Sequence, residues 1–146
     1  MSAPKVPPPC WNLFDARAII MEPGHSLIEF RTEAAHENPF GNVQGGLLAA
    51  MIDNCIGPAV FLLVPDRQMS TIEMKVNYLA PARPGELVRG EARVIKHGRT
   101  TAYVEISLTA ENGTLLARAS ATNVFLGPSE VPADLDRAMD RHRVSG

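Results

Sequence analysis

Residues 38–60 read NPFGNVQGGLLAAMIDNCIGPAV and predict the central element of the fold. The stretch begins with asparagine, proline and glycine, becomes almost wholly apolar, and carries Asp53 in the middle of the apolar run. Apolar side chains recur at helical spacing from Gly45 onward, with few polar positions on any side, so we expect a central, buried helix. Gly57 and Pro58 should end or kink it. A carboxylate in such a helix must find partners, shift its pKa or do chemistry.

The segments on either side of this helix predict strands. Residues 16–33 resemble two short strands around a turn at residues 22–25. From Met69 the apolar period changes to two, and Ile72, Met74 and Val76 alternate with a second face that includes Thr71. Further strands follow at residues 86–96, 101–110 and 115–126, with turn sequences PARPG, HGRT and ENGT between the strands. Four strands joined by short turns predict an antiparallel meander wrapped around the helix, an α+β fold.

Length, composition and charge limit the class of protein. The chain has 146 residues, 45% of them hydrophobic, which suits one domain. A formal net charge of -2 and a pI near 6.1 give no general attraction to nucleic acid or anionic membranes. The first residues lack an apolar leader, and the longest apolar stretch is interrupted by Asp53, Asn54 and Pro58, so we expect a cytoplasmic protein without a membrane span. The expected divisions are a proline-rich arm (1–9), one domain (10–126) and a polar tail (127–146) with a short surface helix at 133–143.

Cysteine and histidine offer little chemistry. Cys10 and Cys55 are poorly placed for a stabilising disulfide, and Cys55 is most simply a small core residue without an adjacent histidine to activate it. The four histidines, at positions 25, 36, 97 and 142, are scattered. We therefore predict no metal site and no cofactor.

The helix with its glycine pair, wrapped by an antiparallel sheet, resembles the hotdog fold. Within it, residues 37–57 (ENPFGNVQGGLLAAMIDNCIG) are similar to the segment of phenylacetyl-CoA-type acyl-CoA thioesterases that carries Asn, a short loop, His-Gly-Gly and a helix aspartate. Asn38, Gly45, Gly46 and Asp53 keep that spacing, while Gln44 stands where the family usually has histidine. The resemblance continues through residues 70–126 and covers roughly residues 29–126.

The resemblance implies a thioesterase site built from five catalytic residues and one supporting glycine. Asp53 would act as general base on water or attack the carbonyl directly, and the Gly45 amide, at the positive end of the helix dipole, would bond the thioester oxygen. Gly46, placed with the substrate-binding residues, would serve as packing support. The Asn38 carboxamide would bond the carboxylate or the thioester oxygen, and the Thr71 hydroxyl would position the attacking water. Gln44 would orient groups by hydrogen bonds without taking a proton.

Each of these residues also has a structural interpretation. A glycine pair commonly makes a sharp turn into a helix, an asparagine before proline is commonly a turn former, and threonine is an ordinary strand residue. Asp53 alone could be a structural aspartate bonded to a polar neighbour. The surrounding pattern favours the catalytic interpretation.

The resemblance further implies an acyl-CoA substrate and a homodimer. Asn38 and Gly45 of one chain would meet Asp53 and Thr71 of another, and two such dimers would form a homotetramer. Phosphates of coenzyme A need basic groups at the mouth of the site. On or near turns, the candidates are Arg99, Lys96 and Arg83.

Two other functions remain open at this stage. Gln44 allows a protein that binds an acyl-CoA or an aromatic metabolite without hydrolysing it. An enoyl-thioester hydratase would need a catalytic histidine, and neither His36 nor His97 falls in a matching segment. The acyl group itself is not specified by the sequence.

Overall fold

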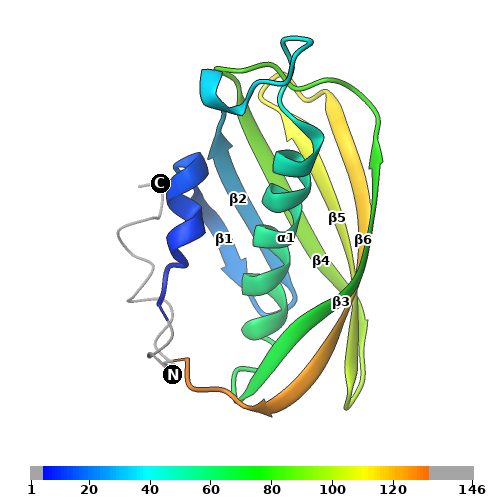
Figure 1. Ribbon diagram of the computed structural model, residues 1–146. Helices are drawn as coiled ribbons and strands as arrows, with labels where there is room; N and C mark the ends of the chain where they lie inside the picture. The colour runs from blue at the N-terminus through cyan, green and yellow to red at the C-terminus, as the bar shows by residue number, and fades with distance from the viewer. Residues whose placement is uncertain (1–4, 132–146) are drawn as a thin grey trace.

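The computed structural model describes residues 5–131 as one curved sheet around one long helix (Figure 1). In chain order the elements are the 3-10 helix η1 (Pro9–Phe14), strands β1 (Arg17–Glu22) and β2 (His25–Arg31), the 3-10 helix η2 (Ala34–His36), helix α1 (Gly45–Phe61), and strands β3 (Arg67–Tyr78), β4 (Leu87–His97), β5 (Thr101–Ala110) and β6 (Leu115–Pro128). Among residues 5–131, no helix combines the length and hydrophobicity that crossing a bilayer requires.

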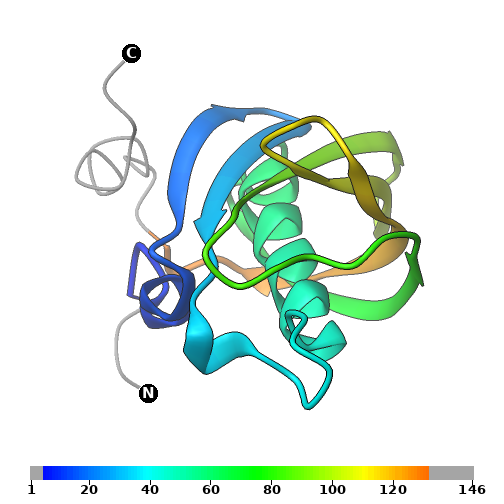
Figure 2. The same ribbon diagram turned by 90° about the horizontal axis from the view of Figure 1, so that it is seen from above.

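The six strands form one antiparallel sheet in the order β1-β2-β4-β5-β6-β3. Figure 2, a view from above, shows the sheet curling around α1. The predicted α+β class, an antiparallel sheet wrapped around a long central helix as in the hotdog fold, is confirmed.

The meander prediction is wrong at one step, because β3 does not pair with β4. Instead β3 pairs with β6, and β4 lies between β2 and β5. Residues 79–86, which contain the PARPG sequence, connect β3 to β4 across the end of the helix (Figure 2). Pro81 and Pro84 have no amide hydrogen for a hairpin ladder, and the segment is long enough to cross instead of turning back.

Helix α1 is buried on one face only, which corrects the expectation of a helix surrounded on all sides. The buried side chains pack on the concave face of the sheet and are Leu48, Met51, Ile52, Cys55, Ile56, Ala59 and Val60. Gly46 and Asp53 lie on the exposed face. The helix also continues through Gly57 and Pro58 to Phe61, so the expected end at these residues is wrong.

Helix and sheet are in close contact at Gly90 of β4. A Cβ atom there would overlap Sγ of Cys55 and lie 3.1 Å from side-chain atoms of Leu108 and Phe30. Both cysteines are free thiols, and Cys55 is a buried core residue, as its sequence context predicts. Glycine at position 90 therefore sets the distance between α1 and the sheet.

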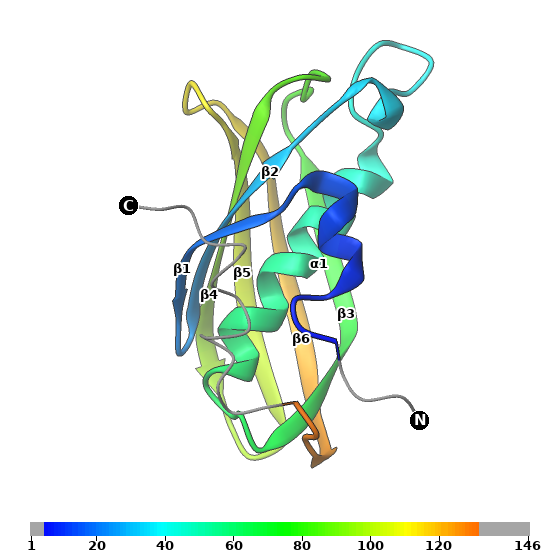
Figure 3. The ribbon, with the colours of Figure 1, turned by 90° about the vertical axis from the view of Figure 1, so that its left-hand side faces the viewer.

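The N-terminal segment contributes to the same core. Trp11 and Phe14 of η1 are each 2% exposed, and Val6 packs against the buried cluster. Figure 3 shows η1 next to α1, where the Cys10 Sγ donates to Asn54 Oδ1 at 3.3 Å. At the other end β6 runs to Pro128. The surface helix expected at residues 133–143, like residues 1–4 of the arm, lies outside the described part of the chain.

Candidate active site

A chain of three polar side chains runs from the sheet to the exposed face of the helix. Asn123 Nδ2 donates to Thr71 Oγ1 at 2.9 Å, and the Thr71 hydroxyl donates to Asp53 Oδ1 at 3.2 Å. Asn123 is fully buried, Thr71 is partly exposed, and Asp53 is exposed. The arrangement therefore holds a carboxylate at the surface through a hydroxyl that is itself anchored in the core.

A β-bulge in β3 brings Thr71 to the helix side of the sheet. Thr71 pairs with Asn123 and Glu73 pairs with Thr122, so Ile72 is an extra residue opposite the β6 ladder. The extra residue changes which face the following side chains occupy. Ile72 is 62% exposed, whereas Thr71 lies on the same side as the partly buried Met74. The predicted alternation, which put Ile72 with Met74 opposite Thr71, is wrong for this reason.

The N-terminus of α1 presents two amide groups. Within residues 5–131, the N–H groups of Gly45 and Gly46 have no hydrogen-bond acceptor. The helix dipole adds partial positive charge at this end, so the pair can bind an oxyanion. Gln44 is the helix N-cap, and its Oε1 accepts from the Leu47 amide at 3.0 Å. Its carboxamide also lies over Gly46, where a Cβ atom would come within 2.8 Å of Oε1.

Asn38 and Tyr78 lie beside this helix terminus. The Asn38 Oδ1 accepts from the amides of Phe40 and Asn42, at 2.9 and 3.2 Å, which is the hydrogen bonding of a turn former. The Tyr78 hydroxyl donates to the Gly45 carbonyl at 2.8 Å. With Gly45 they line an open groove of about 370 Å³ at the connection from β3 to β4.

The two groups of candidate residues are separated along the helix. Gly45 and Asp53 are eight residues apart, which corresponds to about 12 Å of helix axis. Asn38 lies in the loop that precedes the helix, so Gly45 lies between Asn38 and Asp53 along the chain. A single chain therefore brings Asp53 together with Thr71, and Asn38 together with Gly45, but does not bring the two pairs to one point.

The candidate basic residues lie at both ends of the molecule. Arg83 is in the connection from β3 to β4, at the end that holds Gly45. Arg99 is in the turn between β4 and β5 at the opposite end, where its carbonyl accepts from the Arg67 guanidinium at 2.8 Å, and Lys96 is near the same turn (Figure 1). One chain does not gather these three charges.

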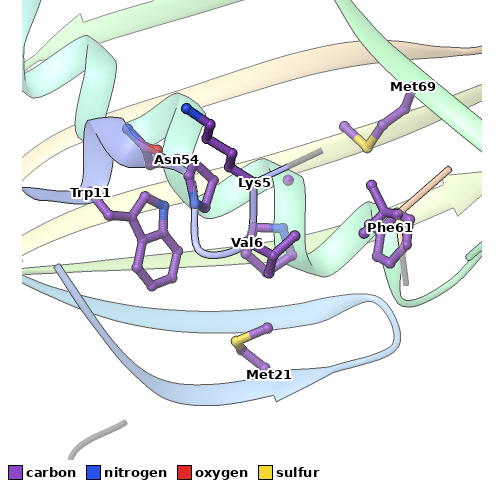
Figure 4. A pocket seen from close by; sticks show the side chains of 11 residues that line it. Lys5, Val6, Trp11, Met21, Asn54, Phe61 and Met69 are labelled. Carbon is purple, nitrogen blue, oxygen red and sulfur yellow. The ribbon is translucent and has the colours of Figure 1, made fainter. Parts of the chain in front are cut away.

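An apolar cavity of about 260 Å³ begins one residue along the helix from Asp53. Asn54, Gly57 and Phe61 line it from α1, and Met69 lines it from β3, two residues before Thr71. The N-terminal segment closes another side with Val6, Pro8 and Trp11 (Figure 4). The lining suits an apolar group, although neither Asp53 nor Thr71 is among the residues that line this cavity.

Two histidines, His25 and His36, serve structural contacts. The ring of the buried His36 accepts from the Glu33 amide at Nδ1 (3.0 Å), and its Nε2 lies 2.9 Å from the Leu13 carbonyl, which joins η2 to η1. His25 Nε2 lies 2.8 Å from Glu91 Oε1. No cluster of three or more metal-ligating side chains is found within residues 5–131.

Sequence reasoning assigned no role in the site to Asn123 and none to the Tyr78 hydroxyl. A signal for Asn123 does exist, since it is the polar residue in an inward row that otherwise contains Ala117, Ala119, Ala121 and Phe125. The role of Tyr78 had no local signal, because its hydroxyl reaches a carbonyl 33 residues away.

Comparisons with known proteins agree with this architecture. The family model of the thioesterase superfamily matches residues 40–117. Acyl-coenzyme A thioesterase 13 of Homo sapiens is 32% identical over 101 residues, which cover 68% of this chain and 72% of that protein. Zebra fish thioesterase superfamily member 2 superposes with a TM-score of 0.75 at 27% identity, covering 82% of this chain and 88% of its own. The E. coli PaaI protein from the phenylacetic acid degradation operon superposes with a TM-score of 0.80 at 17% identity, covering 84% and 88%.

Proposed function

The chain belongs to the thioesterase superfamily and is a thioester hydrolase, and from this premise we propose that it hydrolyses an acyl-CoA to a free carboxylic acid and coenzyme A. The similarity to acyl-coenzyme A thioesterase 13 supports this substrate class. The observation that carries the mechanism is the exposed Asp53 carboxylate held by Thr71 and, through it, by Asn123.

Asp53 is the group that acts on the acyl carbon. The Thr71 hydroxyl donates a hydrogen bond to Oδ1 of Asp53. Within residues 5–131, no side chain or amide donates to Oδ2 of Asp53, so this oxygen is free to take a proton from water. As general base, the carboxylate takes a proton from a water molecule, which attacks the carbonyl and expels coenzyme A as its thiolate. As nucleophile, the carboxylate attacks the carbonyl itself, the C–S bond breaks to release the thiolate, and water then cleaves the resulting anhydride to the free acid and the regenerated carboxylate. Both routes need the same exposed carboxylate, and detection of an acylated Asp53 by mass spectrometry in a single turnover distinguishes them.

The Gly45 amide is the proposed donor to the thioester oxygen. Negative charge develops on that oxygen as the carbonyl carbon becomes tetrahedral, and a free N–H at the positive end of a helix stabilises it. The absence of a side chain lets the oxygen approach closely. In this proposal Asn38 bonds the site through its carboxamide, Gly46 supports the approach, and Gln44 keeps the terminus in place as N-cap.

The separation between Asp53 and Gly45 implies a site shared by two chains. We propose a homodimer in which Gly45 and Asn38 of one chain meet Asp53 and Thr71 of another. Two observations support it: the 12-residue strand β3 is an edge strand with Ile72 and Tyr78 exposed, and the exposed face of α1 carries Asp53. Pairing of two such edges in antiparallel fashion would set the helices side by side in opposite directions. Two dimers would then form the expected homotetramer.

The same arrangement accounts for the positions of the basic residues. In an antiparallel dimer, the end of one chain that carries Arg83 lies beside the end of the other that carries Arg99 and Lys96. The coenzyme A phosphates would then meet cations from both chains. The acyl group would enter the apolar cavity that Asn54 and Met69 line, which favours apolar acyl chains or rings over charged ones.

The test is the initial rate of free thiol release from a panel of aromatic and aliphatic acyl-CoAs, for the wild type and Asp53→Asn. The variant removes the basic oxygen while keeping the size of the side chain. We expect its kcat to fall by about 10²–10⁴-fold, the range for a lost general base. Circular dichroism and sedimentation show whether the variant remains folded and assembled.

Asp66→Asn is a matched control, because Asp66 lies in the turn before β3 and is exposed. Its rate should equal that of the wild type. An Asp53→Asn variant with the wild-type rate would exclude the carboxylate mechanism. A wild type that binds acyl-CoAs but releases no thiol would instead support the non-hydrolytic binding protein.

A further inference from the structure

We propose that Asn123 is a positioning residue that fixes the direction of the Thr71 hydroxyl and, through it, holds the Asp53 carboxylate. The inference rests on the proposed function, because it concerns the same carboxylate. Asn123 itself is fully buried and lies one hydrogen bond further from the substrate than Thr71.

The position of Asn123 is unusual for the strand that carries it. The inward row of β6 is otherwise made of alanine and phenylalanine side chains that are all buried. Asn123 interrupts this row opposite Thr71, at the bulge in β3. The carboxamide thus points from the core of the sheet toward the one hydroxyl that contacts Asp53.

Hydrogen-bond polarity determines which end of the carboxamide must face Thr71. An ionised Asp53 can only accept, so the single hydroxyl proton of Thr71 is used in the bond to Asp53. Thr71 Oγ1 can then only accept from its other neighbour, and that neighbour must present an N–H. Asn123 Nδ2, at 2.9 Å, does so. An oxygen at the same place would compete with Asp53 for the hydroxyl proton.

The other end of the carboxamide has no partner. Among the buried side-chain nitrogen and oxygen atoms of residues 5–131, Asn123 Oδ1 alone has no hydrogen bond. The other buried polar residues, Ser26, Thr32 and His36, have partners. An unpaired buried acceptor lowers stability, so packing does not explain the residue. Its donor end does.

A double-mutant cycle with Thr71→Val and Asn123→Leu tests the inference. Leucine is close to asparagine in size and removes the donor. We expect Asn123→Leu to lower kcat by roughly 3- to 10-fold, with KM changed less than about twofold, because one positioning hydrogen bond is lost. In the Thr71→Val background, the same substitution should have no further effect on kcat, since the hydroxyl that it positions is already absent. An equal loss in both backgrounds would overturn the inference.

Thermal unfolding separates positioning from a structural role. Because Asn123→Leu removes an unpaired acceptor, its Tm should equal or exceed that of the wild type while kcat falls. A lowered Tm together with a changed KM would mean that Asn123 merely supports the fold. Asp53→Asn, measured alongside, tests the proposed function separately. Full activity of this variant would exclude Asp53 as the general base, whereas the hydrogen bond between Asn123 and Thr71 would still be present.

Nuclear magnetic resonance of the Asn123 side-chain amide tests that hydrogen bond without any assay of activity. Replacing Thr71 by valine should shift one Nδ2 proton and speed its exchange with solvent, and Thr71→Ser should restore both. Thr122→Val, one residue along β6 on the other face, is the control and should change neither. Signals unaffected by Thr71→Val would overturn the inference even if Asn123→Leu does not fold.

Discussion

At the scale of single residues, position on one helix turn decides that the Asp53 carboxylate is exposed and the Cys55 thiol is buried. Asp53 is exposed, whereas Cys55, two residues further, is fully buried and packed against Gly90. Burial, and to a smaller extent the charge of Asp53, raises the pKa of the Cys55 thiol far above its ordinary value. The thiol is therefore protonated at neutral pH, and the proposed mechanism assigns the chemistry of this helix to the Asp53 carboxylate instead.

A pH dependence of stability follows from Glu91 on β4. Its Oε1 lies 2.8 Å from His25 Nε2 and 2.7 Å from an Arg93 guanidinium nitrogen. Partial burial opposes ionisation, but the hydrogen bonds and charges of His25 and Arg93 outweigh it and lower the pKa of Glu91 from its ordinary 4.5. A lowered pKa in the folded state contributes stability above the unfolded pKa, and this contribution is lost as the pH falls through the folded value.

We therefore expect Glu91→Gln to have a lower Tm than the wild type at neutral pH. The difference should shrink as the pH falls below about 4.5 and vanish once Glu91 is protonated in the folded state as well. Thermal unfolding followed by circular dichroism at several pH values measures it. Glu111→Gln, in the exposed turn between β5 and β6, should differ little from the wild type throughout. A difference for Glu91→Gln that persists in strong acid would contradict the explanation.

At the scale of elements, the site depends on how α1 is held against the sheet. The missing side chain of Gly90 lets the helix approach β4, and the bulge at Ile72 turns Thr71 toward the same helix. Both are single positions on strands, yet each decides where Asp53 lies relative to its partners.

Gly90→Ala should therefore destabilise the fold. The added methyl group overlaps Cys55 Sγ and crowds Leu108 and Phe30, so we expect a loss of about 1–3 kcal/mol in the free energy of unfolding, the usual cost of overpacking. Urea denaturation measures it. Gly98→Ala, in the turn after β4 with open space around it, should change stability by less than about 0.5 kcal/mol. If the overlap is the cause, Cys55→Ala should reduce the effect of Gly90→Ala.

At the scale of the whole molecule, the candidate residues of one chain lie in two separate places, which the proposed function treats as two halves of a shared site. Asp53 and Thr71 lie together on the exposed face of the helix and the neighbouring strand, while Gly45 and Asn38 lie at the end of the helix. The exposed edge of β3 offers the surface through which another copy could complete both halves.

Complementation between two inactive chains tests the shared site. Asp53→Asn and Gly45→Ala should each lose most activity on their own. After unfolding and refolding as an equal mixture, half of the dimers combine both chains, and each has one site with native Gly45 and native Asp53. We expect about one quarter of the wild-type activity.

The control mixture combines Asp53→Asn with Thr71→Val. Both changes lie in the same half of the site, so no mixed dimer contains an intact site and activity should not recover. If Asp53→Asn mixed with Gly45→Ala also fails to recover, although sedimentation shows mixed dimers, the site lies within one chain.

The sequence by itself determined the elements and the family. The period of 3.6 after Gly45, the period of two after Met69, and the spacing of Asn38, the glycine pair and Asp53 are local properties of the chain. The two periods predicted the central helix and the antiparallel sheet. The resemblance to the acyl-CoA thioesterases implied the family and singled out Asp53 and Thr71, which the structure joins by a hydrogen bond.

Only the tertiary structure decided which strands are neighbours and which groups meet. The pairing of β3 with β6 brings Thr71 to Asn123, 52 residues later, and no local period contains such a contact. The bulge at Ile72 reverses the face of Thr71 through one extra residue, and the exposure of Asp53 depends on which face of the helix the sheet covers. These features arise from packing between distant segments, and local periodicity therefore does not predict them.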